Sequence, residues 1–151
     1  DPHQAENLLL WGAVGTGKDH LALAAVRTVL KRHALSCWWQ NGRDLAAEWR
    51  ACIDDGGERG LMATLTKRTL LVLSDPLPPI GSLSNYQADM LYRVIRARTD
   101  NGLATICTVN VSSDQEADDR MGAPTWDRLA QGAWKIHCSW PTHRNPAKVI
   151  E

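Results

Sequence analysis

The chain has 151 residues, of which 44% are hydrophobic and 23% charged, the ordinary range for a single globular domain with its own core. Its 17 basic and 17 acidic residues cancel to a formal net charge of zero. This balance excludes a general electrostatic attraction to nucleic acid or to a membrane surface, so that any such contact must come from a local patch.

The cysteines and the absence of long apolar segments bear on the compartment. Cys37, Cys52, Cys107 and Cys138 form no C-x-x-C pair and no metal-binding spacing. Three of them fall in apolar, strand-like segments, where a reduced cysteine behaves as a small buried hydrophobe. No apolar segment reaches the length of a membrane span, and no signal peptide opens the chain. We therefore expect a reducing, cytoplasmic location without membrane contact.

The first predicted elements enclose the most informative segment. Residues 7–11 are predicted to form a buried strand, residues 18–32 a helix, and G-A-V-G-T-G-K lies between them. Glycines allow such a loop to turn its backbone N–H groups toward phosphate oxygens, and the helix start and Lys18 add positive charge. The segment predicts a nucleotide site made of Gly12, Ala13, Val14, Gly15, Thr16, Gly17, Lys18, Asp19 and His20.

The rest of the chain alternates between apolar and helical segments. Further strands are expected at 35–39, 69–74, 103–109 and 133–139. Helices are expected at 41–52, 84–99 and 125–131, with another candidate at 58–66. Continuous apolar strands separated by helices predict a parallel sheet that is covered on both faces. In such a sheet Trp38 and Trp39 point to opposite faces, and both are expected in the core.

Five segments, in chain order, carry a resemblance to a known family. They are the phosphate loop with its flanks, Leu70–Asp75, Thr105–Asn110, Trp126–Leu129 and Trp140–Arg144. Together they resemble the P-loop ATPases of the AAA+ class, and within it the DnaC-type helicase loaders and the IstB-type transposition helper ATPases.

The resemblance implies a fold and a set of partners. The fold is a three-layer α/β P-loop NTPase with a five-stranded parallel sheet of order 5-1-4-3-2, one ATPase core over residues 1–151 and no separate lid domain. The resemblance further implies ATP and Mg²⁺ as cofactors, and self-association through the edge that carries Arg128. The implied partners are a replicative helicase or a transposase, and DNA.

The same resemblance assigns roles to four side chains. Asp75 would polarise the attacking water, Asn110 would sense the γ-phosphate, and Arg128 would reach the nucleotide of a neighbouring subunit. Arg144 resembles a second sensor. The residues alone leave ordinary roles open: a cap before Pro76, a turn residue, a surface ion pair and a solvated charge, respectively.

Two departures from the family pattern fall on the Mg²⁺ site. Asp19 stands where a hydroxyl is expected, and Ser74 stands where the first acidic residue of its strand is expected. One interpretation is a decayed site. The other, which we favour, is an exchange in which Asp19 and Ser74, with Asp75, still present carboxylate and hydroxyl groups to Mg²⁺.

A basic strip is a candidate surface for single-stranded DNA. Tyr92, Arg93, Arg96 and Arg98 combine cations with an aromatic ring, although a solvated helix face gives the same pattern more often.

Three functions remain as hypotheses. The first is an ATP-hydrolysing assembly factor in DNA replication or transposition, and the second is a nucleotide-dependent binding module with little or no hydrolysis. The least favoured is a small P-loop kinase, because the chain lacks Ser or Thr after Lys18 and an arginine-rich lid.

Overall fold

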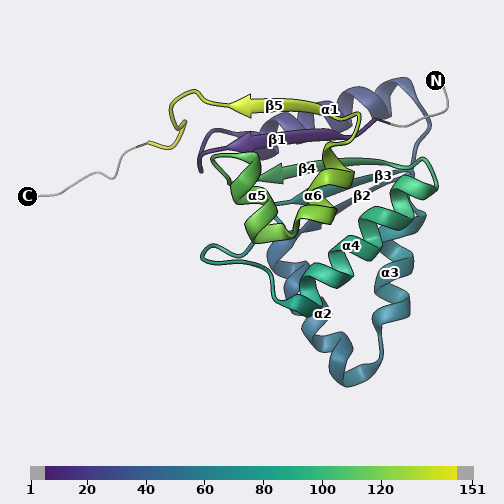
Figure 1. Ribbon diagram of the computed structural model, residues 1–151. Helices are drawn as coiled ribbons and strands as arrows, with labels where there is room; N and C mark the ends of the chain where they lie inside the picture. Colours follow the sequence, from purple (N-terminus) through teal and green to yellow (C-terminus); the bar gives the residue numbers. More distant parts are fainter. Residues whose placement is uncertain (1–5, 146–151) are drawn as a thin grey trace, which may run out of the picture.

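The sheet has five parallel strands in the order β2-β3-β4-β1-β5, which confirms the predicted order read from the other edge (Figure 1). The computed structural model describes residues 6–145. The strands are β1 (Leu8–Gly12), β2 (Cys37–Asn41), β3 (Leu70–Ser74), β4 (Ala104–Val109) and β5 (Trp134–Cys138). The helices are α1 (Lys18–Arg32), α2 (Gly42–Asp55), α3 (Glu58–Lys67), α4 (Asn85–Asp100), α5 (Asp114–Met121) and α6 (Ala123–Ala130).

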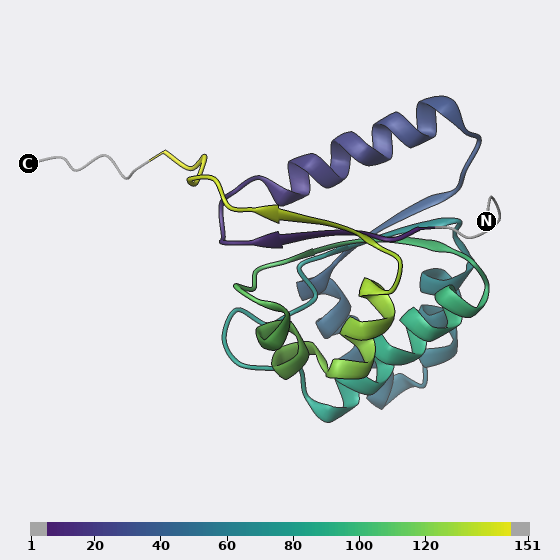
Figure 2. The ribbon, with the colours of Figure 1, turned by 45° about the horizontal axis from the view of Figure 1, so that its top comes forward.

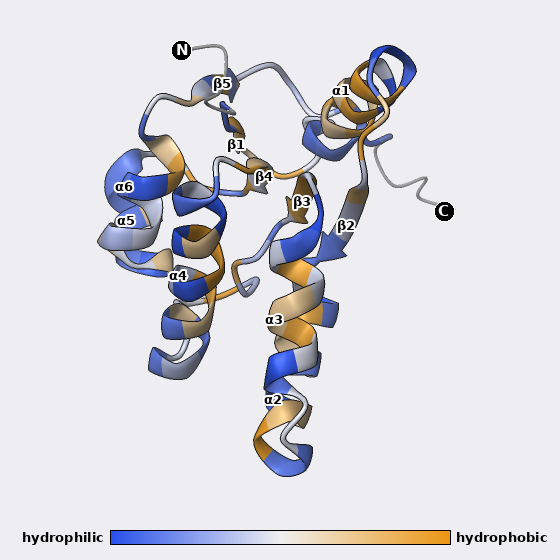
Figure 3. Ribbon diagram, turned by 90° about the vertical axis from the view of Figure 1, so that its right-hand side faces the viewer, coloured by the Kyte–Doolittle hydropathy of each residue, from blue (hydrophilic) through white to orange (hydrophobic). Residues whose placement is uncertain are grey.

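The helices cover the two faces of the sheet unequally. Figure 2 shows α1 by itself on one face and the other helices together on the opposite face. The larger core cluster lies under this second group and includes Leu9 and Leu71, whereas the smaller cluster lies under α1 and includes Leu10 and Val72. Neighbouring residues of one strand therefore enter different cores, as the pleat of a strand requires. β3 is buried along its whole length and is orange, the hydrophobic colour, in Figure 3.

The two edge strands are less buried than the sequence predicts. Trp38 and Trp39 keep 38% and 37% of their surface exposed, so the expectation that both lie in the core is wrong. β2 is an edge strand, and the strands that α1 contacts most are the central strands β4 and β1. Trp134 of β5, the opposite edge, is 67% exposed.

Helix α5 is the one helix that the sequence analysis did not expect. Its eight residues include only two buried side chains, Ala117 and Met121, which lie one turn apart. What starts the helix is the cap: the Ser113 hydroxyl accepts the Glu116 N–H at 3.1 Å. Local polar bonds, rather than an apolar stripe, therefore define this element.

Arg98, near the end of α4, is buried with 1% of its surface exposed. Its guanidinium donates five hydrogen bonds, to Oγ1 of Thr105 and to the carbonyls of Leu65, Arg68, Thr69 and Ala104. Desolvation lowers the pKa of Arg98 to about 10. This side chain joins the end of α3 to the starts of β3 and β4.

All four cysteines are free thiols, and Cys107 and Cys138 are buried. Within residues 6–145, no helix is both long and apolar enough to cross a membrane.

Candidate functional site

The phosphate loop folds as its glycines require. Gly12 ends β1 with φ 138° and lies so close to the carbonyl of Cys138 that a Cβ atom would overlap it. Gly17 precedes the first turn of α1 with φ 83°, a conformation that residues with a side chain rarely adopt. Between them the backbone turns toward the open end of the sheet, where phosphate oxygens would meet the start of α1.

The segment after β5 is hydrogen-bonded to this loop. The sequence did not predict this contact. The indole N–H of Trp140 donates to the carbonyl of Thr16 at 2.7 Å, and the backbone N–H of His143 donates to the carbonyl of Gly15 at 3.0 Å. The hydroxyl of Thr142 also donates to Gly15. The two segments are distant in sequence, so the resemblance of W-P-T-H-R to a family segment was the one feature of the sequence that could have indicated this contact.

Lys18 is folded back onto the loop. Its ammonium donates to the carbonyls of Gly12, at 3.1 Å, and of Ala13, and only 7% of the residue is exposed. Desolvation lowers the pKa of Lys18, and Asp75 and Asp19 are among the anionic groups that oppose this shift. The ammonium therefore lies inside the loop, where an outer phosphate would accept hydrogen bonds from it.

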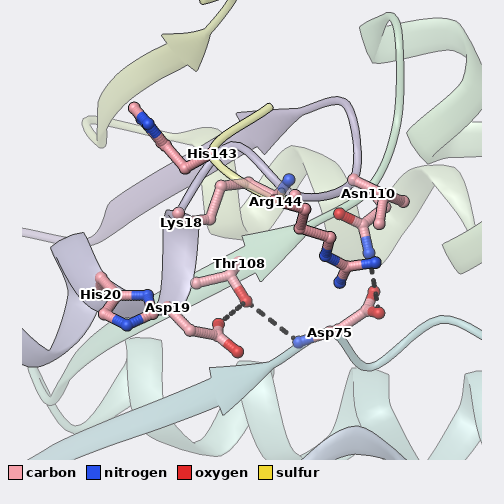
Figure 4. Close-up of a pocket in the computed structure, with 11 residues that line it drawn as sticks. Lys18, Asp19, His20, Asp75, Thr108, Asn110, His143 and Arg144 are labelled. Carbon is pink, nitrogen blue, oxygen red and sulfur yellow. Dashed lines mark hydrogen bonds between the residues drawn. The ribbon is translucent and has the colours of Figure 1, made fainter. Parts of the chain in front are cut away.

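A cleft of about 360 Å³ opens beside the loop and collects predicted residues from separate segments (Figure 4). The predicted residues that line it are Val14, Gly15, Gly17, Lys18, Asp19, His20, Asp75, Asn110 and Arg144. Thr108 and His143 also line it, and neither was predicted. Thr108 precedes Asn110 by two residues, so the period of a strand could have indicated that it faces the same way.

Asp75 and Asn110 are in direct contact at the carboxyl ends of β3 and β4. The side-chain amide of Asn110 donates to Oδ2 of Asp75 at 2.8 Å. Desolvation raises the pKa of Asp75, and the hydrogen bond from Asn110 opposes the shift. A half-buried carboxylate with raised proton affinity, held by an amide and facing a cleft, has the properties of a group that polarises water.

Asp19 and Ser74 also meet, as the exchange interpretation requires. The Ser74 hydroxyl donates to Oδ2 of Asp19 at 2.8 Å, and the Thr108 hydroxyl donates to Oδ1 at 2.8 Å. Each carboxylate oxygen keeps a lone pair for another partner.

These oxygen groups fit Mg²⁺. In the described part of the chain no group of three His, Cys, Asp or Glu residues could hold a metal ion. Such an ion would therefore depend on water and phosphate oxygens as well, which is how proteins commonly bind Mg²⁺.

Arg128 and Arg144 occupy different surroundings. The exposed Arg144 lines the cleft, and Figure 4 shows its side chain extending into it. The described residues that line the cleft do not include Arg128. Arg128 lies 3.6 Å from a carboxylate oxygen of Asp100 and over the ring of Tyr92.

The candidate DNA-binding strip does not form a continuous cationic surface, and the alternative of a solvated helix face fits Arg93 and Arg96 better. Arg98 is buried, Arg93 pairs with Glu58 of α3 at 2.6 Å, and Arg96 lies 3.6 Å from Asp100. One cation therefore belongs to the core and two face acidic side chains. The pattern could not reveal this, because the carbonyls that Arg98 binds come from two segments that are distant in sequence, residues 65–69 and residue 104.

Comparisons with known proteins show the family and the fold of this chain. The sequence matches the family model for the IstB-like ATP binding protein over residues 3–144. No curated protein matches the chain. The crystal structure of the DnaC helicase loader is 22% identical, with a TM-score of 0.80, over 91% of this chain and 80% of that one.

Two further structures share the fold. DnaI is 20% identical, with a TM-score of 0.75, over 89% of this chain and 73% of that one. The replication initiator DnaA, bound to AMPPCP and single-stranded DNA, is 19% identical, with a TM-score of 0.73, over 89% of this chain. The match spans 40% of the DnaA chain.

Proposed function

This chain belongs to the family of IstB-like ATP binding proteins, and from that premise we propose that it is an ATP-hydrolysing assembly factor. In this proposal it binds ATP with Mg²⁺, associates with further copies of itself and helps to place a protein partner on DNA. The observation that carries the proposal is the contact between Asp75 and Asn110 in the cleft that Lys18 also lines.

The chemistry needs positioning and charge more than covalent steps. Lys18 and the loop amides would hold the phosphates, and Asp19 with Ser74 would hold Mg²⁺, which supplies charge neutralisation. Asp75 would orient and polarise a water molecule, while the amide of Asn110 keeps its carboxylate aimed at the cleft. Arg144 is close enough to the cleft to contact an outer phosphate.

Arg128 is proposed to act on the nucleotide of a neighbouring copy. Its position outside the cleft of its own chain supports this role. Its partner Asp100 is 56% exposed, and an ion pair of that kind at 3.6 Å contributes little stability. The guanidinium can therefore leave Asp100 when a second copy presents a γ-phosphate.

The partners are proposed from the relatives. DnaC is described as a helicase loader, and the DnaA structure contains single-stranded DNA. A replicative helicase or a transposase, and single-stranded DNA, are the corresponding partners proposed here.

A binding module with little or no hydrolysis is the second candidate. Asp19 favours it, because a carboxylate stands where the family has a hydroxyl, and it adds negative charge beside the phosphates.

One experiment separates these functions. ATP binding is measured by calorimetry, and phosphate release is measured with and without single-stranded DNA, for the wild type, Asp75→Asn and the exposed control Asp89→Asn. Hydrolysis predicts that Asp75→Asn binds ATP but releases no phosphate, whereas Asp89→Asn resembles the wild type. Binding without release in all three proteins would support the binding module. Absence of ATP binding to the wild type would refute both.

A further inference from the structure

A single arginine of α5 joins the two segments that leave β3 and β4. Arg120 donates through Nε to the carbonyl of Gly81 at 2.9 Å and through Nη2 to that of Pro78 at 2.6 Å. Its Nη1 donates to the carbonyl of Asn110 and to Oε1 of Glu116, both at 3.1 Å. The side chain is 18% exposed, and none of the roles above uses it.

The segment that Arg120 binds on one side begins directly after Asp75. Residues 76–83 form an irregular loop between β3 and α4. Two more bonds tie its end to α5: the Leu83 N–H donates to the carbonyl of Arg120, and the Ser82 hydroxyl donates to that of Asp119. The loop and α5 are thus bonded at several points.

The backbone of Asp75 needs such support. Its φ is 48°, and it is the only residue other than glycine with a positive φ among those that the structure describes. A left-handed conformation at such a residue persists when its surroundings impose it. On one side, Gly42 lies so close to Asp75 that a Cβ atom on residue 42 would overlap the carbonyl of Asp75. On the other side, the hydrogen bonds from Arg120 to the carbonyls of Pro78 and Gly81 fix the loop that follows Asp75.

We propose that Arg120 is a positioning residue for the Asp75–Asn110 pair. One guanidinium fixes both the loop that follows Asp75 and the backbone of Asn110, so the two side chains stay in contact beside the cleft. This inference rests on the proposed function, because the pair matters only if it acts on a nucleotide.

The role requires arginine rather than any cation. A guanidinium donates from three nitrogens in fixed directions, whereas a lysine ammonium is a point donor on a flexible stem. The change Arg120→Lys could keep the charge and one bond, but not the separate bonds to Pro78, Gly81 and Asn110.

The first test compares Arg120→Lys and Arg120→Gln with Arg93→Gln, which removes an exposed ion pair of α4 with α3. ATP affinity should stay within about twofold of the wild type, because Arg120 is not among the described residues that line the cleft. The turnover number should fall about tenfold or more in both Arg120 variants, since small displacements of reacting groups are costly, and not in Arg93→Gln. Wild-type turnover in Arg120→Lys and Arg120→Gln would overturn the proposal.

A double-mutant cycle with Asn110→Ala separates positioning from simple stabilisation. If Arg120 acts through the pair, Arg120→Lys should lower turnover little further once Asn110 is alanine. Full additivity of the two losses would overturn the proposal, as would lower unfolding temperatures with unchanged turnover.

A measurement that is independent of hydrolysis keeps the two proposals distinct. The side-chain amide signals of Asn110 are followed by NMR in the ATP-free protein. Arg120→Lys should shift or broaden them, and Arg93→Gln should not. Should the wild type bind ATP without turnover, the proposed hydrolysis fails, and these signals alone decide the positioning role. Unchanged Asn110 signals in Arg120→Lys would then refute it.

Discussion

The hydroxyl of Ser74, at the end of β3, donates a hydrogen bond of 2.8 Å to the carboxylate of Asp19, in the first turn of α1. In P-loop ATPases a hydroxyl from the loop and a carboxylate from the third strand of the sheet hold Mg²⁺. Here the two residue types are exchanged between the two positions, and the side chains are in contact. The contact is what a compensated exchange requires, and it yields the first prediction.

The double variant Asp19→Thr with Ser74→Asp should restore an ordinary arrangement and keep or raise ATP turnover. Either single variant should be less active, because it leaves two hydroxyls or two carboxylates at the metal. Residues that share one ion are expected to be non-additive in this way. Phosphate release by the four proteins, at equal ATP saturation, measures the coupling. Purely additive effects would indicate a decayed site.

Removal of Mg²⁺ should weaken ATP binding steeply. The Asp19 carboxylate lies in the cleft with the proposed phosphate position, and a cation held by Asp19 itself would offset their repulsion most directly. Asp19→Ala should therefore bind ATP with less dependence on the metal. Calorimetric titrations with Mg²⁺ and with a chelator, on the wild type and this variant, provide the comparison. An equal effect of chelation on both proteins would contradict the prediction.

Lys18→Ala should abolish ATP binding while the chain remains folded. Among the described residues, the hydrogen bonds of the ammonium all go to the loop itself, to the carbonyls of Gly12 and Ala13 and to the hydroxyl of Thr16. Lys31→Ala, at the exposed end of the same helix, is the matched control and should bind normally. Circular dichroism checks the fold, and wild-type affinity in Lys18→Ala would refute the phosphate-loop assignment.

Arg128→Ala should lower turnover without weakening ATP binding. An arginine supplied by a neighbour can raise phosphoryl-transfer rates about a thousandfold or more. Specific activity of the wild type should accordingly increase with protein concentration or with added DNA. Arg96→Ala serves as the control, because Arg96 also faces Asp100 from the surface. A rate that depends on neither concentration nor Arg128 would argue against action between copies.

Arg98→Met should destabilise the fold by about 3 kcal/mol or more, since five acceptors around this buried side chain lose a charged donor. Arg96→Met, two residues earlier on the exposed face, should change stability by about 0.5 kcal/mol or less. Urea unfolding of both variants measures the difference. Similar stabilities would show that burial of Arg98 contributes nothing beyond a surface position.

The central strands were predictable because they are largely apolar. β3 and β4 are almost fully buried, and such segments leave a strong signal between helices. The order of strands came from the family resemblance, not from periodicity. The contact between Asp19 and Ser74 could be anticipated because both residues replace members of one known pair.

The remainder depends on long-range hydrogen bonds that no local pattern encodes. Arg98 and Arg93 lie on the same helix, yet Arg98 is buried and binds backbone carbonyls, whereas Arg93 binds an exposed carboxylate. Helix α5 lacks an apolar stripe, so the periodicity of its sequence does not reveal it. The helix begins at a hydrogen-bonded cap instead. Arg120 binds carbonyls from two loops, and backbone acceptors have no signature in a sequence.

The strand that leads into the phosphate loop has no partner near it in the chain. Leu8 pairs with Ile106 on one side and with Trp134 on the other. During synthesis, β1 can therefore pair with β4 only after residue 109 has left the ribosome, and with β5 only after residue 138. Pairings between such distant segments slow folding and prolong the risk of aggregation. Trp140 and His143 reach the loop later still, so the braced form of the proposed ATP site is the last part to be completed, and bound ATP would stabilise the finished fold by mass action.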